Sequence, residues 1–170
     1  CDCAERGILS LFPDWEIVKV PMADGGEGTV ESLIDGTNGK IYNEETLDPL
    51  GEKIVSKYGV LGDKNIAIIE MATTSGLELI PEAKRNPYIT TTYGTGQLML
   101  KALDHNVEKI ILGIGGSATT DGGAGMLQAL GAKLTDKEGK EIGFGGFELG
   151  KLENIDFSGL DERLKNVEIL

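Results

Sequence analysis

The chain has 170 residues, 40% of them hydrophobic and 5% aromatic, and a formal net charge of −12 at pH 7. This length and apolar content can bury a core and predict one domain or slightly more. The acidic charge argues against binding to nucleic acid or to an anionic membrane, and apolar runs of only a few residues exclude a membrane-spanning helix. With 25 glycines and few aromatic residues, the composition favours an α/β enzyme with many tight loops.

Two cysteines, Cys1 and Cys3, stand at the start of the sequence. A C-x-C pair without further cysteines or a nearby histidine is a poor framework for zinc or for a disulfide. We interpret both cysteines as incidental and expect a cytoplasmic protein.

The first elements in chain order are a helix over residues 4–12 and a strand over 16–20. Ile17, Val18 and Val20 favour a buried parallel position for this strand. An acidic glycine loop over 22–28 follows and leads into a helix over 29–34. Open α/β sheets commonly bind ligands at such loops, beyond the carboxyl ends of their strands.

The next region changes character, with extended segments over 40–47, 53–58 and 66–71 and a turn at 62–65. Short turns between consecutive strands predict antiparallel pairing. The cluster of turn residues at 48–51 indicates that a second, mixed α/β unit begins there.

A second unit of strand, glycine loop and helix lies further along the chain. It consists of a strand over 110–114, a loop of Gly, Ser, Thr and Asp over 115–123, and a helix over 124–130. The pattern also predicts a helix over 97–104, a strand over 133–135, a helical turn over 158–164 capped by Ser158, and a strand beginning at 167–170.

The loop over 115–123 is the first candidate site. Glycines let backbone N–H groups turn toward an anion, hydroxyls can donate to phosphate, and the Asp121 carboxylate can hold Mg²⁺. An alternative is that these side chains only cap the next helix. The predicted phosphate-binding residues here are Gly115, Gly116, Ser117, Thr119, Gly122 and Gly123, with Asp121 as a catalytic or metal-binding residue.

The loop over 22–28 is the second candidate site. Asp24 can serve as a metal ligand or as a general base, and Gly25, Gly26 and Glu27 complete a loop that can bind substrate. The alternative is a plain turn from strand to helix, with acidic residues placed favourably at the helix start. Thr91 and Thr95, in the hydroxyl-rich segment over 90–96, are weaker binding candidates because threonine is also a common structural residue.

Other chemistries also remain open. The segment from Gly113 to Ala118 fits the dinucleotide pattern G-x-G-x-x-A, and Asp136 lies near the distance expected for a ribose-binding acid. An NAD-binding module and a non-catalytic structural domain are therefore alternatives. A Walker-type P-loop is excluded because the chain has no G-x-x-x-x-G-K-[ST] run.

The sequence contains, in this order, the runs VPMADGGEGTVESLI (20–34), IEMATTSGLELIP (69–81), TTTYGTGQLML (90–100) and ILGIGGSATTDGGAGMLQALGAKL (111–134). It also contains GFGG (143–146) and FSGLDERL (157–164). Together these runs closely resemble the bacterial type I glycerate kinases. Thr120 departs from the family pattern, since many relatives carry Asn there. The resemblance covers essentially the whole chain, as about the first half of a longer relative.

This resemblance implies transfer of the γ-phosphoryl group of ATP to D-glycerate, with Mg²⁺, to give a phosphoglycerate. It implies a flavodoxin-like α/β domain, here residues 1–47 without its N-terminal strand, followed by part of an inserted mixed α/β domain over 48–170. Asp24 and Glu27 would organise the metal or the glycerate hydroxyls. The cationic partner of the phosphates would lie outside this chain, so we expect the chain alone to be inactive. Both the 2- and the 3-phosphate stay open as products, as does the oligomeric state.

Overall fold

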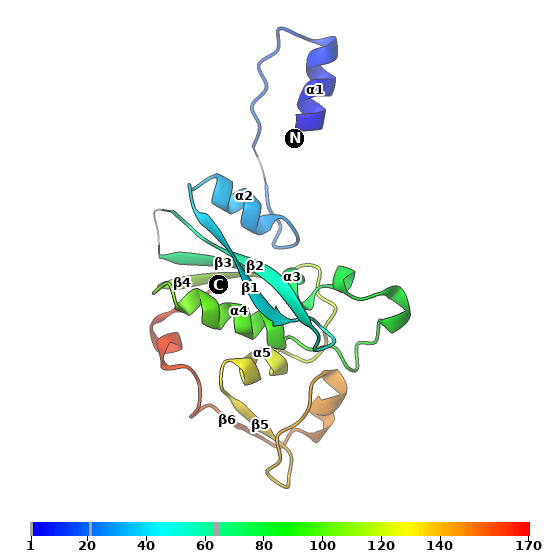
Figure 1. The fold of residues 1–170 in the computed structure, drawn as a ribbon, viewed down its shortest axis with the longest axis vertical. Helices are drawn as coiled ribbons and strands as arrows, with labels where there is room; N and C mark the ends of the chain where they lie inside the picture. Colours follow the sequence, from blue (N-terminus) through cyan, green and yellow to red (C-terminus); the bar gives the residue numbers. More distant parts are fainter. Residues whose placement is uncertain (1, 21, 63–64) are drawn as a thin grey trace.

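The computed structural model describes residues 2–20, 22–62 and 65–170. Its main elements are drawn in Figure 1. In chain order they are α1 (Asp2–Leu11), α2 (Thr29–Asp35), β1 (Lys40–Leu47), β2 (Lys53–Val60), β3 (Ile66–Glu70), α3 (Ala72–Ser75), η1 (Leu77–Leu79), η2 (Glu82–Lys84), α4 (Tyr93–Leu103), β4 (Lys109–Gly113), α5 (Ala124–Ala129), β5 (Lys133–Thr135), η3 (Gly146–Lys151), β6 (Asn154–Asp156), η4 (Glu162–Asn166) and β7 (Glu168–Ile169).

Among the described residues, β1-β2-β3-β4-β7 form a mixed sheet in that order, and β5 and β6 form a small separate one. The pairs β1·β2 and β2·β3 are antiparallel, whereas β3·β4 and β4·β7 are parallel. The α/β prediction and the antiparallel pairing of the strands after residue 39 are therefore confirmed. Parallel pairing places the ends of β3 and β4 at one edge of the sheet, with Glu70 beside Gly113.

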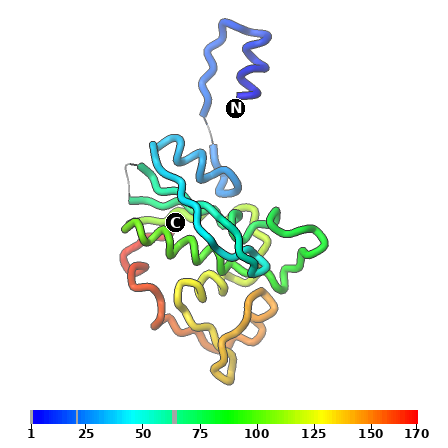
Figure 2. The backbone as a smooth tube through the Cα atoms, viewed as in Figure 1, coloured from blue at the N-terminus to red at the C-terminus, as the bar shows by residue number. Residues whose placement is uncertain are grey.

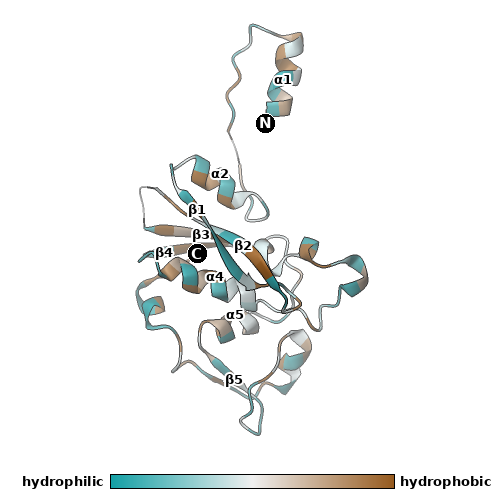
Figure 3. Ribbon diagram, viewed as in Figure 1, coloured by the Kyte–Doolittle hydropathy of each residue, from teal (hydrophilic) through white to brown (hydrophobic). Residues whose placement is uncertain are grey.

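Helices cover both faces of the sheet (Figures 1 and 2). Alternate side chains of β3 point to opposite faces, as the pleat requires. Ile68 packs with Val30 and Ile34 of α2, whereas Ala67 and Ile69 join the larger cluster around α4. Figure 3 shows hydrophilic and hydrophobic residues alternating along α2 and α4, as expected for helices with one buried face.

The segment over residues 2–20 projects from the body of the molecule (Figures 1 and 2). Its helix α1 has no buried residue, and the predicted strand over 16–20 is wrong, because these residues have no regular structure. Val18 and Val20 are 76% and 66% exposed. A buried parallel strand needs neighbours that accept its hydrogen bonds and cover its faces, and no described strand pairs with this segment.

The other elements follow the sequence pattern, with small shifts of their ends. Ser158 does not cap the last helical turn as predicted; the Asp161 carboxylate caps η4 instead, by accepting a hydrogen bond from the Arg163 N–H. The predicted turn at 62–65 includes residues 63 and 64, which lie outside the described residues. Within the described part of the chain, no helix has both the length and the apolar character needed to cross a bilayer.

The division into two domains stays a prediction, but the structure bears on the place of the boundary. β1 and β2 pair along their whole length, from Lys40 opposite Val60 to Leu47 opposite Lys53. A boundary between residues 47 and 48 falls inside this hairpin.

Candidate functional site

The two glycine loops predicted from the sequence lie against each other at the end of β4. The Gly115 N–H donates to the Gly25 carbonyl at 3.0 Å. The backbones approach so closely that a Cβ atom on Gly113 would lie 2.5 Å from the Gly25 oxygen, and one on Gly115 would lie 2.9 Å from Gly26 Cα. Gly113 and Gly115 are therefore required to be glycine, because the neighbouring backbone leaves no room for a side chain. We call the contact between the loops over 22–28 and 115–123 the seam.

The loop over 24–28 is braced from both of its ends. The Asp24 carboxylate accepts from the Gly26 N–H at 3.0 Å, and the Gly25 N–H donates to Thr29 Oγ1 at 3.1 Å. Asp24 and Glu27 are exposed, and neither forms an ion pair within the described residues. These two carboxylates are therefore available to a ligand at the seam.

Glu27 reaches across the seam to the second loop. Gly116 has a left-handed backbone with φ +72°, and a Cβ atom there would lie 2.6 Å from Glu27 Oε1. The N–H groups of Gly116 and Ser117 have no acceptor within the described residues. A carboxylate and free backbone donors thus lie side by side, a combination that suits a phosphate bound together with a cation.

The hydroxyls of Ser117 and Thr119 extend this surface. Their oxygens lie 2.9 Å apart, and the Thr119 N–H donates to Ser117 Oγ at 3.1 Å. The loop is fixed to the segment over 75–77 by two backbone hydrogen bonds of 2.9 Å. The Leu77 N–H donates to the Gly116 carbonyl, and the Ala118 N–H donates to the Ser75 carbonyl. Ser117 is exposed, and its hydroxyl is accessible to a ligand at the seam.

Asp121 is placed differently from the prediction. It is only 1% exposed, and its Oδ2 accepts from the Thr92 N–H at 2.8 Å, the Thr92 hydroxyl at 2.9 Å and the Gly125 N–H at 3.1 Å. Its Oδ1 accepts from the Gly123 N–H at 3.2 Å. In this structure Asp121 joins the starts of α4 and α5, and its surroundings do not support a direct role in metal binding or catalysis.

The remaining predicted residues also support the site rather than line it. Thr91 and Thr95 are buried, and Thr95 Oγ1 lies 2.8 Å from Thr74 Oγ1 and 3.0 Å from Ser75 Oγ. Gly122 and Gly123 have left-handed backbones at the entry to α5. At the start of α5 the Gly123, Ala124 and Gly125 N–H groups donate to Asp121 and the Met126 N–H to Thr92 Oγ1, so these donors are engaged within the chain; the phosphate-binding role of Gly122 and Gly123 stays a prediction.

The residue that sequence reasoning missed is Glu70. This carboxylate is 1% exposed at the end of β3, and its Oε1 accepts from the Val30 N–H of α2 at 2.5 Å. The available signal was an acidic residue closing the otherwise apolar strand sequence IAIIE. A carboxylate is costly to bury without partners, so its position calls for an explanation.

The donor set at the seam fits Mg²⁺, which proteins usually hold through one or two carboxylates together with substrate phosphates. Asp24 and Glu27 can supply those carboxylates, whereas Asp121 cannot while it caps α5. Within the described residues no group of three or more His, Cys, Asp and Glu side chains could hold a metal by itself.

The geometry does not favour the dinucleotide alternative. The Gly115 N–H, one of the donors that a pyrophosphate would need, is already bonded to the Gly25 carbonyl, which also lies against Gly113. The Asp136 carboxylate accepts from the Glu138 and Lys140 N–H groups, at 2.9 and 3.0 Å, and so closes its own turn.

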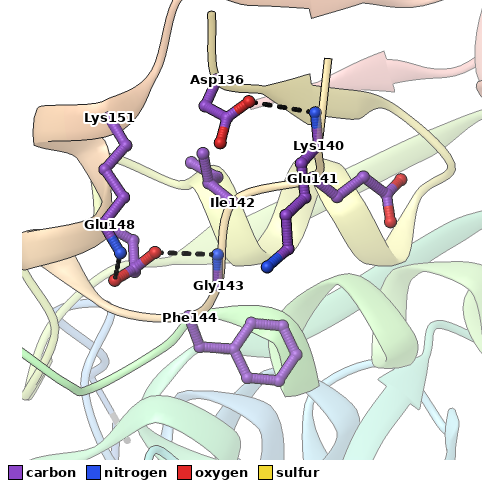
Figure 4. Close-up of a pocket in the computed structure, with 8 residues that line it drawn as sticks. All are labelled: Asp136, Lys140, Glu141, Ile142, Gly143, Phe144, Glu148 and Lys151. Atoms are coloured by element: carbon purple, nitrogen blue, oxygen red, sulfur yellow. Dashed lines mark hydrogen bonds and ion pairs between the residues drawn. The ribbon is translucent and has the colours of Figure 1, made fainter. Parts of the chain in front are cut away.

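A hollow of about 400 Å³ lies elsewhere, between β5 and η3 (Figure 4), and contains no residue of the two glycine loops, although Asp136, the candidate ribose-binding acid, lines it. Two of its carboxylates are engaged within the chain: Asp136 accepts from the Glu138 and Lys140 N–H groups, and Glu148 accepts from the Gly143 N–H and pairs with Lys151. The seam between the glycine loops therefore remains the candidate site.

Comparison with known proteins agrees with the sequence motifs at the seam. The glycerate kinase family model matches residues 1–170. The chain is 56% identical to a glycerate kinase of Bacillus subtilis (strain 168) over 168 residues, which are 99% of this chain and 44% of that protein. It is 56% identical to the glycerate 2-kinase of Escherichia coli (strain K12) over 165 residues, which are 97% of this chain and 43% of that protein.

A solved structure gives the same result. The crystal structure of a candidate glycerate kinase 2 from Salmonella typhimurium LT2 matches with a TM-score of 0.86 and 52% identity, covering 99% of this chain and 46% of that one. The chain thus spans less than half the length of these relatives. It belongs to the glycerate kinase family.

Proposed function

We propose that the protein carrying this chain is an ATP-dependent kinase that phosphorylates D-glycerate, with the seam between the two glycine loops as part of its active site. The observation that carries the proposal is that the Glu27 carboxylate lies against Gly116, whose N–H, like that of Ser117, has no acceptor within the described residues. Phosphoryl transfer needs positioning and charge neutralisation more than covalent chemistry from the protein. The family and the names of the relatives support glycerate as the acceptor.

The second loop binds phosphate oxygens in this proposal. Gly116 and Ser117 donate their N–H groups, and the hydroxyls of Ser117 and Thr119 donate from the exposed side of the loop. Because these donors are fixed by the contacts with Ser75 and Leu77, they need little reorganisation when the ligand binds.

In this proposal the loop over 22–28 binds glycerate, which accepts the phosphoryl group. One oxygen of Asp24 is held by the Gly26 N–H, so the carboxylate is oriented while its other oxygen stays free to take the proton of a glycerate hydroxyl. Glu27, together with Asp24 where that carboxylate is not acting as the base, would hold Mg²⁺, and the ion would supply neutralisation of charge on the phosphate oxygens. The positive side chain that phosphoryl transfer commonly uses comes from outside this chain in our proposal.

Glycerate-dependent consumption of ATP tests the proposal. We expect turnover by a protein of the relatives' full length, none with lactate in place of glycerate, and none by the 170-residue chain alone. Equal ATP consumption with and without glycerate would contradict the kinase proposal. Equal turnover by the isolated chain would contradict the need for residues outside it.

The dinucleotide alternative is separated from the kinase by thermal unfolding. A ligand that binds only the native state raises the melting temperature. We expect Mg-ATP to raise the melting temperature of the full-length protein and NAD to leave it unchanged.

A further inference from the structure

Glu70 is a buried carboxylate that no proposed chemical step uses. It lies at the end of β3, is 1% exposed, and forms no ion pair within the described residues. A buried charge without a counter-ion is stable only when hydrogen bonds replace its water shell. Within the described residues, the Glu70 side chain accepts a hydrogen bond from the Val30 N–H, at 2.5 Å.

This bond connects Glu70 to the first glycine loop. Val30 lies in the first turn of α2, next to Thr29, whose Oγ1 accepts from the Gly25 N–H. The Gly25 carbonyl in turn accepts from the Gly115 N–H of the second loop. The position of α2 along the sheet therefore decides how the first loop meets the second.

The backbone of the same strand end is tied to the second loop. Glu70 is opposite Gly113 in the parallel pair of β3 and β4, and the Met71 N–H donates to the Gly113 carbonyl at 2.9 Å. Glu70 thus contacts the start of α2 through its side chain while its strand fixes Gly113 through the backbone. No other acidic residue of the described sheet joins both loops in this way.

We propose that Glu70 is a positioning residue, which holds the Asp24 loop in register with the Gly113–Gly116 loop without touching substrate. The catalytic importance of this register rests on the proposed function; the structural part does not. Loss of the acceptor leaves the Val30 N–H buried and unpaired, which loosens α2 and the loop that precedes it.

Hydrogen exchange of the full-length protein tests the structural part without any measurement of kinase activity. Replacing Glu70 with alanine (Glu70→Ala) should speed exchange of the amides over residues 25–30 by roughly tenfold relative to those of β3 and α4. Glu70→Gln keeps an oxygen acceptor of the same reach and should restore most of the protection. Should Glu70→Ala fail to fold, Glu70→Gln still tests the proposal, because accelerated exchange over 25–30 in that variant contradicts it.

Asp48→Ala provides a matched control. Asp48 is also a buried carboxylate, 7% exposed, and its Oδ1 accepts from the Leu50 and Glu52 N–H groups in the turn between β1 and β2. The Asp48→Ala substitution should lower the melting temperature while leaving the protection of residues 25–30, relative to β3 and α4, unchanged. Exchange that rises evenly over the whole chain in Glu70→Ala, or that is unchanged over 25–30, would overturn the positioning role.

Turnover of the full-length protein tests the link to function. Glu70→Ala should lower kcat/KM for glycerate roughly tenfold at a temperature where the protein is folded, and Glu70→Gln should recover it. If exchange behaves as expected but the wild-type protein does not phosphorylate glycerate, the proposed function fails and the structural role of Glu70 stands. If exchange behaves as expected but Glu70→Ala turns over normally, the positioning role in the reaction is refuted.

Discussion

The two glycine loops have similar sequences but use their aspartates in opposite ways. Asp24 is exposed and makes one short-range bond, to the N–H of Gly26. Asp121 is 1% exposed and accepts four hydrogen bonds that connect α4 with α5. An acidic residue in a glycine loop can therefore be either a ligand for substrate or an internal anchor for the helix that follows.

The difference between the loops arises from which carboxylate accepts the N–H groups at the start of the helix that follows each loop. At α2 the carboxylate that caps the first turn is Glu70, supplied by the neighbouring strand, which leaves Asp24 free. At α5 the capping carboxylate is Asp121 itself. A helix start that receives its anion from another part of the chain can release its own acidic residue for chemistry.

The largest expected effect is on folding, from Asp121→Ala. Four donors, in Thr92, Gly123 and Gly125, lose their acceptor in a buried place, so we expect the free energy of unfolding to fall by on the order of 3 kcal/mol. Urea denaturation of the two proteins measures this change. A normal unfolding free energy combined with loss of Mg²⁺ dependence would restore Asp121 as a metal ligand.

For Asp24→Asn we expect a large loss of activity and little change in stability. The amide keeps the size of the side chain and its bond to Gly26 but cannot take a proton, so kcat of the full-length protein should fall by roughly 100-fold. The unfolding free energy should change by less than about 0.5 kcal/mol, because the residue is exposed. Kinetics with glycerate and urea denaturation of the same preparations check both parts. A strongly destabilised Asp24→Asn would remove the contrast between the loops.

The contact between the loops is tested by Gly115→Ala. The added methyl group would lie 2.9 Å from Gly26 Cα, so the backbones must separate, at a cost of about 1–3 kcal/mol in unfolding free energy. We also expect a higher KM for glycerate, because the separated loops no longer present one surface. Gly36→Ala is the control: its new Cβ atom would meet only ordinary contacts of 3.7 and 3.8 Å. Equal effects of the two changes would show that the seam is not constrained.

Much of the fold follows from local pattern. The alternation in β3 and the spacing of apolar residues in α2 and α4 are set by burial on one face, and the structure places them as expected. The prediction of a strand over 16–20 was wrong because this segment is not buried against other elements. Its apolar pattern requires neighbours on both sides, and a pattern within one segment does not specify whether those neighbours are present.

The sequence predicted which loops form the candidate site, but it did not predict which side chains of those loops are exposed and which are buried. Repeated acidic glycine loops pointed to both sides of the seam, and the hydrogen bond from Gly115 to Gly25 shows that the two loops lie together. The sequence does not reveal whether Asp121 turns inward, because that depends on Thr92, which lies 29 residues earlier. Glu70 was missed for a similar reason: its partner Val30 is 40 residues away.

The smallest expected effect concerns pH and the attachment of α2. Glu31, in the first turn of α2, pairs with Lys57 of β2, and the hydrogen bond from this ammonium lowers the pKa of the Glu31 carboxyl below its ordinary value of 4.5. A carboxyl whose pKa is lower in the folded than in the unfolded protein stabilises the fold above the unfolded pKa and loses that contribution as the pH falls through the folded pKa. Acidification below 4.5 should therefore loosen α2.

The contribution of this pair is limited because Glu31 is 41% and Lys57 35% exposed, so solvent screening keeps it below about 1 kcal/mol. In Lys57→Met the unfolding free energy should depend less steeply on pH below 4.5 than in the parent protein. Lys53→Met is the matched control, since Lys53 and Glu45 pair at the far end of the same hairpin, with 74% and 64% exposure. If both variants flatten the pH dependence equally, the effect belongs to general surface charge. If only Lys57→Met does so, the pair between Glu31 and Lys57 contributes to the attachment of α2 to the sheet, in addition to the bond from Val30 to Glu70.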